Sequence, residues 1–179
     1  MKILWLSGFA GSGKDTVAQI LCKKFDYTRV AFADGLKDTT ATKYGFDREL
    51  CDTVEGKKTQ WDTAEGKKTI RDLLIEESAK AKELDLNIYA RRVLDTIYAS
   101  NQQLWVISDW RFPHEYDFLK SALPEAQHTT IRISRVGWPI LQVPSEHQLD
   151  TFPFDVVIMN NNLAVFEQDI LRYMRTIKS

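Results

Sequence analysis

Hydrophobic residues along the chain form short apolar runs that alternate with stretches of helical spacing. An apolar run bounded by glycine or polar residues is typical of a strand buried on both faces of a parallel sheet. Strands are therefore expected at residues 3–6, 29–33, 104–108, 130–134 and 154–159. Apolar positions spaced i, i+3, i+4 predict helices at residues 14–25, 34–45, 69–83, 86–97, 113–123 and 163–177. The alternation predicts an α/β fold with one parallel sheet of about five strands and right-handed connections.

Two segments show neither pattern. Residues 46–68 are rich in charge and threonine, and they contain Glu-Gly-Lys-Lys-Thr twice, at 55–59 and 65–69. Two five-residue copies are too short for a structural repeat, so a long loop or a small insertion is expected there. Residues 135–151 are broken by glycine and proline, and we expect a lid-like loop in which Ser145 and Glu146 begin a short helix.

The most specific motif lies between the first strand and the first helix. Residues 8–16, Gly-Phe-Ala-Gly-Ser-Gly-Lys-Asp-Thr, match the phosphate-loop pattern G-x-x-x-x-G-K in the strand–loop–helix context that the pattern requires. Glycines let backbone N–H groups surround an anion at the helix N-terminus, and Lys14 would reach the β- and γ-phosphates of a nucleotide. The candidate phosphate-binding residues are Gly8, Gly11, Ser12, Gly13, Lys14, Asp15 and Thr16.

The loop departs from the usual pattern at Asp15, where a serine or threonine normally contacts Mg²⁺. A carboxylate could hold the ion directly or through water, and Thr16 offers a hydroxyl one residue later. Asp109 follows a buried strand, at the sheet edge where ligands gather in open α/β folds, and could orient Mg²⁺ or an acceptor hydroxyl. The candidate metal ligands are therefore Asp15, Thr16 and Asp109.

Composition excludes several classes of protein. The 179 residues are 44% hydrophobic and 27% charged with a net charge of −1, which argues against a disordered chain and a strongly basic nucleic-acid binder. Two cysteines and three scattered histidines indicate neither a disulfide scaffold nor a zinc site. No apolar run reaches the roughly 20 residues of a membrane span, and the short apolar N-terminus leads into the glycine loop, so a soluble cytoplasmic protein is expected.

Charged residues outside the loop favour a small kinase. The chain lacks the N-K-x-D base-reading motif of GTPases and is shorter than motor or AAA ATPases. Kinases need cations around the moving phosphoryl group, because catalysis is mostly positioning and electrostatics. The candidate catalytic residues are Lys14, Asp34, Arg71, Asp109, Arg111 and Arg135. The candidate substrate-binding residues are Asp34, Lys37, Arg71, Arg111 and, as an aromatic platform for a base, Trp61.

Each of these candidates also has an ordinary structural interpretation. Asp34 and Asp109 could cap helices, and Arg111 could form a surface ion pair. Arg71 could lie on a solvated helix face, Trp61 could serve local packing, and Arg132 could form an ion pair on the sheet face.

The order of the motifs resembles one family. The matching segments are Gly-Ser-Gly-Lys-Asp-Thr (11–16), Phe-Ala-Asp-x-Leu-Lys (32–37), Thr-Ile-Arg-Asp-Leu-Leu (69–74), Ser-Asp-Trp-Arg-Phe-Pro-x-Glu (108–115), Ser-Glu-x-x-Leu-Asp (145–150) and Phe-Asp-x-x-Ile-x-Asn (154–160). Over nearly its whole length the chain resembles the phage-type deoxynucleoside monophosphate kinases, a family of P-loop kinases.

The resemblance implies a three-layer α/β sandwich, in which a five-stranded parallel sheet of order 2-3-1-4-5 has helices on both faces. It implies a single kinase domain over residues 1–179, with an acceptor-binding region around 46–100 and the lid around 135–151. ATP and Mg²⁺ are the implied cofactors, and a deoxynucleoside monophosphate is the implied acceptor. By position, residues 11–16 hold the donor phosphates; the acceptor side is lined by Asp34, Lys37, Arg71 and Arg111, and the lid carries Arg135.

Two other functions remain open. Relatives of this family are similar to kinases that phosphorylate a hydroxymethylated pyrimidine within DNA, and the lysine pairs 57–58 and 67–68 could then follow a DNA backbone. That acceptor is neutral and needs a base, for which Asp34 and Asp109 are the candidates. A nucleotide-binding regulatory protein without turnover is the third interpretation. A homodimer and, for a viral protein, a location in the host cytoplasm also remain open.

Overall fold

The computed structural model describes residues 1–137 and 144–178. The chain divides into two compact units, of which unit 1 comprises Met1–Ala31 and Leu94–Ser179 and unit 2 comprises Phe32–Val93. Each unit has a hydrophobic core of its own. The region 46–100, expected to bind the acceptor, falls largely within unit 2.

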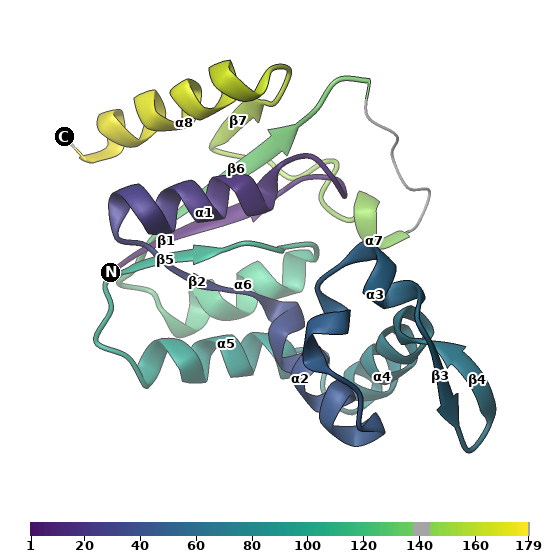
Figure 1. Cartoon of the computed structure of the whole chain (residues 1–179). Coiled ribbons are helices and arrows are strands. Elements are labelled where there is room, and N and C mark those ends of the chain that lie inside the picture. Colours follow the sequence, from purple (N-terminus) through teal and green to yellow (C-terminus); the bar gives the residue numbers. More distant parts are fainter. Residues whose placement is uncertain (138–143, 179) are drawn as a thin grey trace. The chain divides into compact units, whose positions relative to one another are not determined.

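Unit 1 is built on a parallel sheet with the strand order β2-β5-β1-β6-β7 (Figure 1). The strands are β1 (Lys2–Ser7), β2 (Thr28–Val30), β5 (Leu104–Ile107), β6 (Gln127–Ser134) and β7 (Val156–Met159). Counted along the chain within this sheet, the order is 2-3-1-4-5, which confirms the predicted topology. Ser7, the last residue of β1, is paired with Arg132 of β6. Both residues therefore lie near the carboxyl edge of the sheet, where ligands bind in such folds.

Helices cover both faces of this sheet (Figure 1). Figure 1 shows α1 (Lys14–Phe25) and α8 (Leu163–Lys178) on one face and α6 (Pro113–Ala122) on the other. Successive residues of a strand point to opposite faces. Leu4 and Leu6 accordingly join the core cluster with residues of α1 and α8. Trp5 points the other way and meets Tyr116 of α6, with ring centroids 5.0 Å apart.

Unit 2 consists of short helices around a small core, with a β-hairpin attached. Its elements are α2 (Phe32–Tyr44), the 3-10 turn η1 (Arg48–Cys51), α3 (Val54–Lys58), β3 (Gln60–Thr63), β4 (Gly66–Thr69), α4 (Ile70–Leu84) and α5 (Ile88–Tyr98), whose end belongs to unit 1. Cys51, Ile70 and Leu73 are fully buried in its core. Helix α4 begins as the sequence predicts, because Thr69 and Asp72 form a reciprocal capping box.

The structure corrects several predicted elements. The strand expected at 29–33 ends at Val30 and pairs three residues with β5, and Phe32 already begins α2. The segment 46–68 is not one long loop, because it contains η1, α3 and the β3–β4 hairpin. Asp85 ends α4, and α5 begins three residues later at Ile88. The observed β6 starts earlier than expected, at Gln127, and β7 starts later, at Val156.

A membrane-spanning helix is absent from the described part of the chain, since no helix there is both long and apolar enough to cross a bilayer. A short helix, α7 (Pro144–His147), lies within the predicted lid at 135–151 and contains Ser145 and Glu146. Residues 138–143 of that lid lie outside the described residues.

Candidate active site

The phosphate loop joins β1 to α1 in a conformation that requires glycine at two points. Gly13 has φ of 111°, and a Cβ there would lie 2.7 Å from the Asn160 side-chain nitrogen. Gly8 has φ of 147°, and its Cβ would collide with the Ile133 backbone. A side chain is unfavourable in a backbone with positive φ, and it also blocks a close approach to a neighbouring backbone. The Asn160 amide donates to the Ser12 carbonyl over 2.8 Å, so the end of β7 fixes the loop from behind.

Lys14 lies inside this loop. Its ammonium is buried and donates to the carbonyls of Gly8 and Phe9 over 2.6 and 3.0 Å. The pKa of Lys14 is lowered to about 8: burial is the largest cause, the positive charge of Arg111 adds to it, and the carboxylates of Glu146, Asp15 and Asp109 oppose it. An ammonium whose charge is this poorly compensated gains strongly from a bound anion.

The Ser12 side chain adds a second feature that fits a phosphate. Its hydroxyl is buried, and among residues 1–137 and 144–178 it has no hydrogen-bond partner. Buried hydroxyls in native proteins normally find a partner, and an unpaired one indicates a ligand or water. The loop N–H groups, Lys14 and Ser12 together fit the phosphates of a nucleotide.

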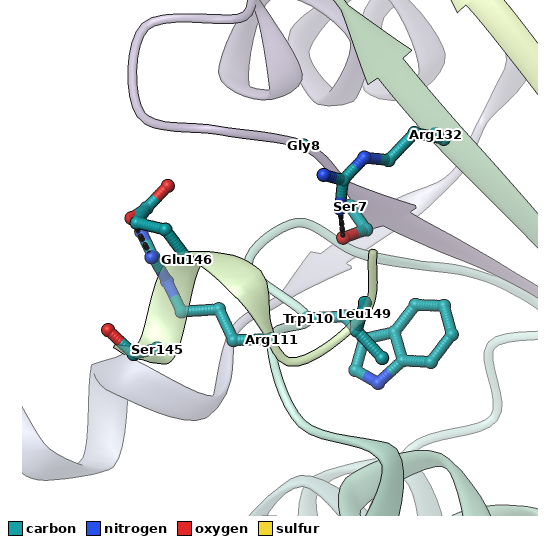
Figure 2. Close-up of a pocket in the computed structure, with 8 residues that line it drawn as sticks. All are labelled: Ser7, Gly8, Trp110, Arg111, Arg132, Ser145, Glu146 and Leu149. Atoms are coloured by element: carbon teal, nitrogen blue, oxygen red, sulfur yellow. Dashed lines mark hydrogen bonds and ion pairs between the residues drawn. The ribbon is translucent and has the colours of Figure 1, made fainter. Parts of the chain in front are cut away.

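A buried carboxylate, Glu146 of α7, connects the loop to Arg111. One carboxylate oxygen accepts the Ala10 N–H over 2.8 Å, and the other accepts from Nη1 of Arg111 (Figure 2). Burial alone would raise the pKa of Glu146, but the Arg111 guanidinium and the Ala10 N–H outweigh burial and lower it. Arg111 is thus an ion-paired arginine at the phosphate loop. Sequence reasoning treated Glu146 only as the start of a helix.

Arg132 supports the base of the same site from β6. Its guanidinium donates to the Ser7 hydroxyl over 3.2 Å and to Asp150 over 3.1 Å, and it stacks 4.6 Å from the centre of the Phe9 ring. Figure 2 shows Arg132 above Ser7 on the wall of a cavity of about 10 Å³, which Arg111 and Glu146 also line. That volume holds about one water molecule. These contacts make Arg132 a structural support of the loop.

The predicted metal ligands lie around Lys14. Asp15 is exposed in the first turn of α1, and both Asp15 and Asp109 act electrostatically on Lys14. Within the described ranges, no three His, Cys, Asp or Glu side chains form a preformed metal site. Mg²⁺ on a nucleotide takes most of its ligands from phosphate and water, so one or two carboxylates suffice. The roles of Asp15, Thr16 and Asp109 stay predictions.

Arg135 and the remainder of the predicted lid are partly described. The Arg135 guanidinium donates to the Gly11 carbonyl over 3.3 Å, which places this arginine beside the phosphate loop, as the lid assignment expects. Its role in catalysis stays a prediction.

Unit 2 holds Asp34 and Lys37 in a network of charges. Lys37 pairs with Asp52 over 2.8 Å and lies 3.9 Å from Asp34. Arg48 pairs with Asp52 over 2.8 Å and lies 3.5 Å from Asp34. Sequence reasoning missed Arg48 and Asp52, because both lie in the segment that was expected to be a loop. The network defines the orientation of Lys37.

Two further cations of unit 2, Lys57 and Arg71, are less compensated than Lys37. The backbone N–H of Ile70 donates to the Thr59 carbonyl over 3.1 Å, which joins the end of α3 to the start of α4. Lys57 and Arg71 flank this junction. Burial lowers the pKa of Lys57, and the charges of Lys37 and Arg71 lower it further. In the part of the chain that the structure describes, neither Lys57 nor Arg71 has a hydrogen bond or an ion pair from its side chain. Lys37, Lys57 and Arg71 are called the unit 2 cation cluster below.

Trp61, the predicted platform for a base, has local packing contacts. Its indole N–H donates to the Tyr44 carbonyl over 3.0 Å, and its ring meets Phe46 edge-on at 5.6 Å, against the unit 2 core. The side chain is half-buried there, and its role in base binding stays a prediction.

The lysine pairs considered for DNA are mostly neutralised. Lys58 pairs with Glu55, Lys68 pairs with both Glu65 and Glu76, and Lys67 lies 3.9 Å from Asp62. Ion pairs of this kind reduce the attraction of a surface for a phosphate backbone.

Comparisons with known proteins agree on the kind of protein. The sequence model of the family described as "Phosphomevalonate kinase" matches residues 6–125. A protein of Acanthamoeba polyphaga mimivirus, named "Putative deoxynucleotide monophosphate kinase", is 30% identical over 177 residues, covering 90% of this chain and 89% of the viral protein.

Solved structures show the same fold. TT1252 from Thermus thermophilus aligns with a TM-score of 0.55 at 15% identity, covering 99% of this chain and 98% of that protein. The dephospho-CoA kinase of Campylobacter jejuni aligns with a TM-score of 0.51 at 17% identity, again covering 99% and 98% of the two chains.

Proposed function

The chain belongs to the phosphomevalonate kinase family of P-loop kinases, and from this premise we propose that it transfers the γ-phosphoryl group of ATP to a deoxynucleoside monophosphate. The products would be ADP and the deoxynucleoside diphosphate. The observation that carries the proposal is the glycine loop with the buried Lys14 ammonium. The name of the viral relative supports a deoxynucleotide as the acceptor.

The donor side of the reaction is assigned to unit 1. The N–H groups of residues 11–15 and the Lys14 ammonium would bind the β- and γ-phosphates. When bound, Mg²⁺ would neutralise phosphate charge, with Asp15, Thr16 and Asp109 as its candidate ligands. Arg111 is held beside the loop N–H of Ala10 by Glu146, so we assign it to the transferring phosphoryl group. Arg135 would contribute a further positive charge there.

The acceptor side is assigned to unit 2. An acceptor monophosphate is a dianion near neutral pH, and the cation cluster of Lys37, Lys57 and Arg71 is suited to bind it. Such a phosphate oxygen is already nucleophilic, so the reaction needs no strong general base. Asp34 then acts by orienting Lys37, 3.9 Å away, and not as a base.

The DNA kinase and the regulatory protein have less support than the proposed function. A kinase acting on DNA would need a basic track, and three of the four lysines at positions 57, 58, 67 and 68 have acidic partners within 3.9 Å. A regulatory protein without turnover gives no reason to bury Lys14 and to hold Arg111 beside the same loop. The family name adds phosphomevalonate as a further phosphorylated acceptor to test.

Transfer of label from [γ-³²P]ATP tests the proposal. The acceptors are the four deoxynucleoside monophosphates, the ribose forms, phosphomevalonate, and DNA containing 5-hydroxymethyluracil or 5-hydroxymethylcytosine. We expect labelled deoxynucleoside diphosphate, lost in Lys14→Ala. Label only in the polymer or in diphosphomevalonate would assign the other acceptors, and tight ATP binding without transfer would indicate a regulatory protein.

Two arginine variants test the assignment of the acceptor phosphate to unit 2. Arg71→Ala should raise KM for the monophosphate about tenfold or more and leave KM for ATP within about twofold, because a charge-assisted bond to phosphate is lost. Arg91→Ala is the matched control, since Arg91 is also an exposed arginine of unit 2 and pairs with Asp85. Equal KM changes in both variants would contradict the assignment.

A further inference from the structure

We propose that Glu146 is a positioning residue that fixes Arg111 and the phosphate loop in one arrangement for phosphoryl transfer. The inference rests on the proposed function, because its purpose is to place a cation beside the donor phosphates. It assigns a role to a side chain that the loop motif does not include.

The two carboxylate oxygens of Glu146 contact the phosphate loop and Arg111, the two groups that the proposal aligns. One accepts the Ala10 N–H over 2.8 Å, within the phosphate loop, and the other accepts from Arg111. These partners lie 136 and 35 residues away along the chain. A single rigid group that bonds both sets the distance between the loop backbone and the guanidinium. Preorganised charge of this kind needs no rearrangement when the reaction proceeds.

Glu146 is itself held by its neighbours. The carboxylate is on α7, whose chain continues to the fully buried Leu149. Asp150 accepts from His147 over 2.7 Å and from Arg132 over 3.1 Å. The His147 ring packs 5.4 Å from the Phe9 ring of the loop. A residue with this support is suited to orient its partners and unsuited to swing away on ligand binding.

The backbone end of Arg111 is equally fixed. The preceding Trp110 is buried and packs edge-on against Phe152 at 4.7 Å and Trp5 at 5.4 Å. The Arg111 N–H donates to the carboxylate of Glu115, which also caps α6. The side chain beyond this anchor is long and rotatable, and Glu146 supplies the contact that restrains its far end. Five N–H donors on a guanidinium leave others for a phosphate.

Glu146→Gln tests the proposal, since glutamine keeps the shape and removes the charge. We expect kcat to fall about 10- to 100-fold with KM for ATP within about threefold. In Arg111→Lys, adding Glu146→Gln should lower kcat by less than about threefold, because the two residues act as a unit. Glu167→Gln is the matched control, an exposed glutamate paired with Lys24 over 2.7 Å.

Several results would overturn the proposal. Unchanged kcat with a lower KM for ATP would show that Glu146 competes with phosphate. Independent effects in the double variant would show that it does not act through Arg111. Should Glu146→Gln fail to fold, hydrogen exchange of the Ala10 amide in the wild-type protein decides, because the proposal requires this amide to be protected and free exchange would refute it.

Failure of the proposed function gives a different pattern. A wild-type protein that phosphorylates no acceptor refutes the kinase assignment. Hydrogen exchange of the Ala10 amide needs no acceptor, and an exchange rate in Glu146→Gln equal to that of the wild-type protein would refute the role of Glu146 separately.

Discussion

We predict that Lys14 makes the proposed use of ATP sensitive to pH between about 7 and 9, where a lysine with the ordinary pKa of 10.5 keeps its charge. Lys14 is buried in the phosphate loop beside Arg111, and its pKa is lowered from 10.5 to about 8. The protonated form binds phosphate, so raising the pH through 8 removes the charge on which donor binding depends. The perturbation is therefore a change of pH, with no substitution required.

The size of the effect follows from the pKa. At pH 7 about 90% of Lys14 is protonated, at pH 8 about half, and at pH 9 about 10%, each pH unit corresponding to about 1.4 kcal/mol. The kcat/KM for ATP reports ionisations of the free enzyme, so it should fall about tenfold between pH 7 and pH 9. Bound phosphate stabilises the ammonium, so kcat at saturating ATP should fall only at higher pH.

Initial rates at limiting and saturating ATP, measured from pH 6.5 to 9.5, provide the assay. Lys14→Arg is the informative variant, because a guanidinium stays protonated throughout this range. Its activity should be lower, and its profile should lack the decline above pH 8. A flat wild-type profile up to pH 9.5, or the same decline in Lys14→Arg, would refute the reasoning.

Three further predictions address the loop and the two cores. Gly13→Ala should reduce ATP affinity about 100-fold or more without unfolding the protein. The added Cβ would lie 2.7 Å from the Asn160 amide nitrogen, in a backbone with φ of 111°. Calorimetric ATP binding near the wild-type value would contradict this prediction. Trp61→Ala should lower the free energy of unfolding by about 2 kcal/mol and leave KM for the acceptor within about twofold. A selective rise in KM for the acceptor would indicate that Trp61 binds the base. Burial lowers the pKa of His128, which accepts the Trp5 indole N–H over 3.1 Å. The unfolded state therefore binds the additional proton, and the melting temperature should fall as pH decreases from about 6.5, less so in His128→Gln.

Local sequence patterns predicted the helices whose bounds depend on residues near to them in the sequence. The helix over residues 14–25 has the observed bounds of α1, because its apolar spacing is unbroken and a glycine loop fixes its start. The alternation of strands and helices predicted one parallel sheet, whereas the order of its strands was implied only by the family resemblance. The hairpin of unit 2 was missed because its strands contain four residues each, too few to establish a period.

The candidate site was predictable only where its residues share a motif. Lys14 and the glycines are contiguous, so one pattern identifies them. Glu146 reaches Ala10 across 136 residues, and nothing in its own neighbourhood indicates that partner. For Trp61 the sequence left both base stacking and local packing open, because an aromatic side chain in a loop can serve either. The structure packs it against the unit 2 core, which sequence periodicity could not reveal because that core combines residues of α2, η1 and α4 with the loop residue Phe46.

A ³¹P NMR time course of the protein with ATP, Mg²⁺ and each deoxynucleoside monophosphate tests the central claim most directly. The account predicts that one or more monophosphate resonances disappear while ADP and the deoxynucleoside diphosphate appear in equal amounts, and that Lys14→Ala abolishes both. ADP with inorganic phosphate alone, or unchanged spectra with every monophosphate, would contradict it.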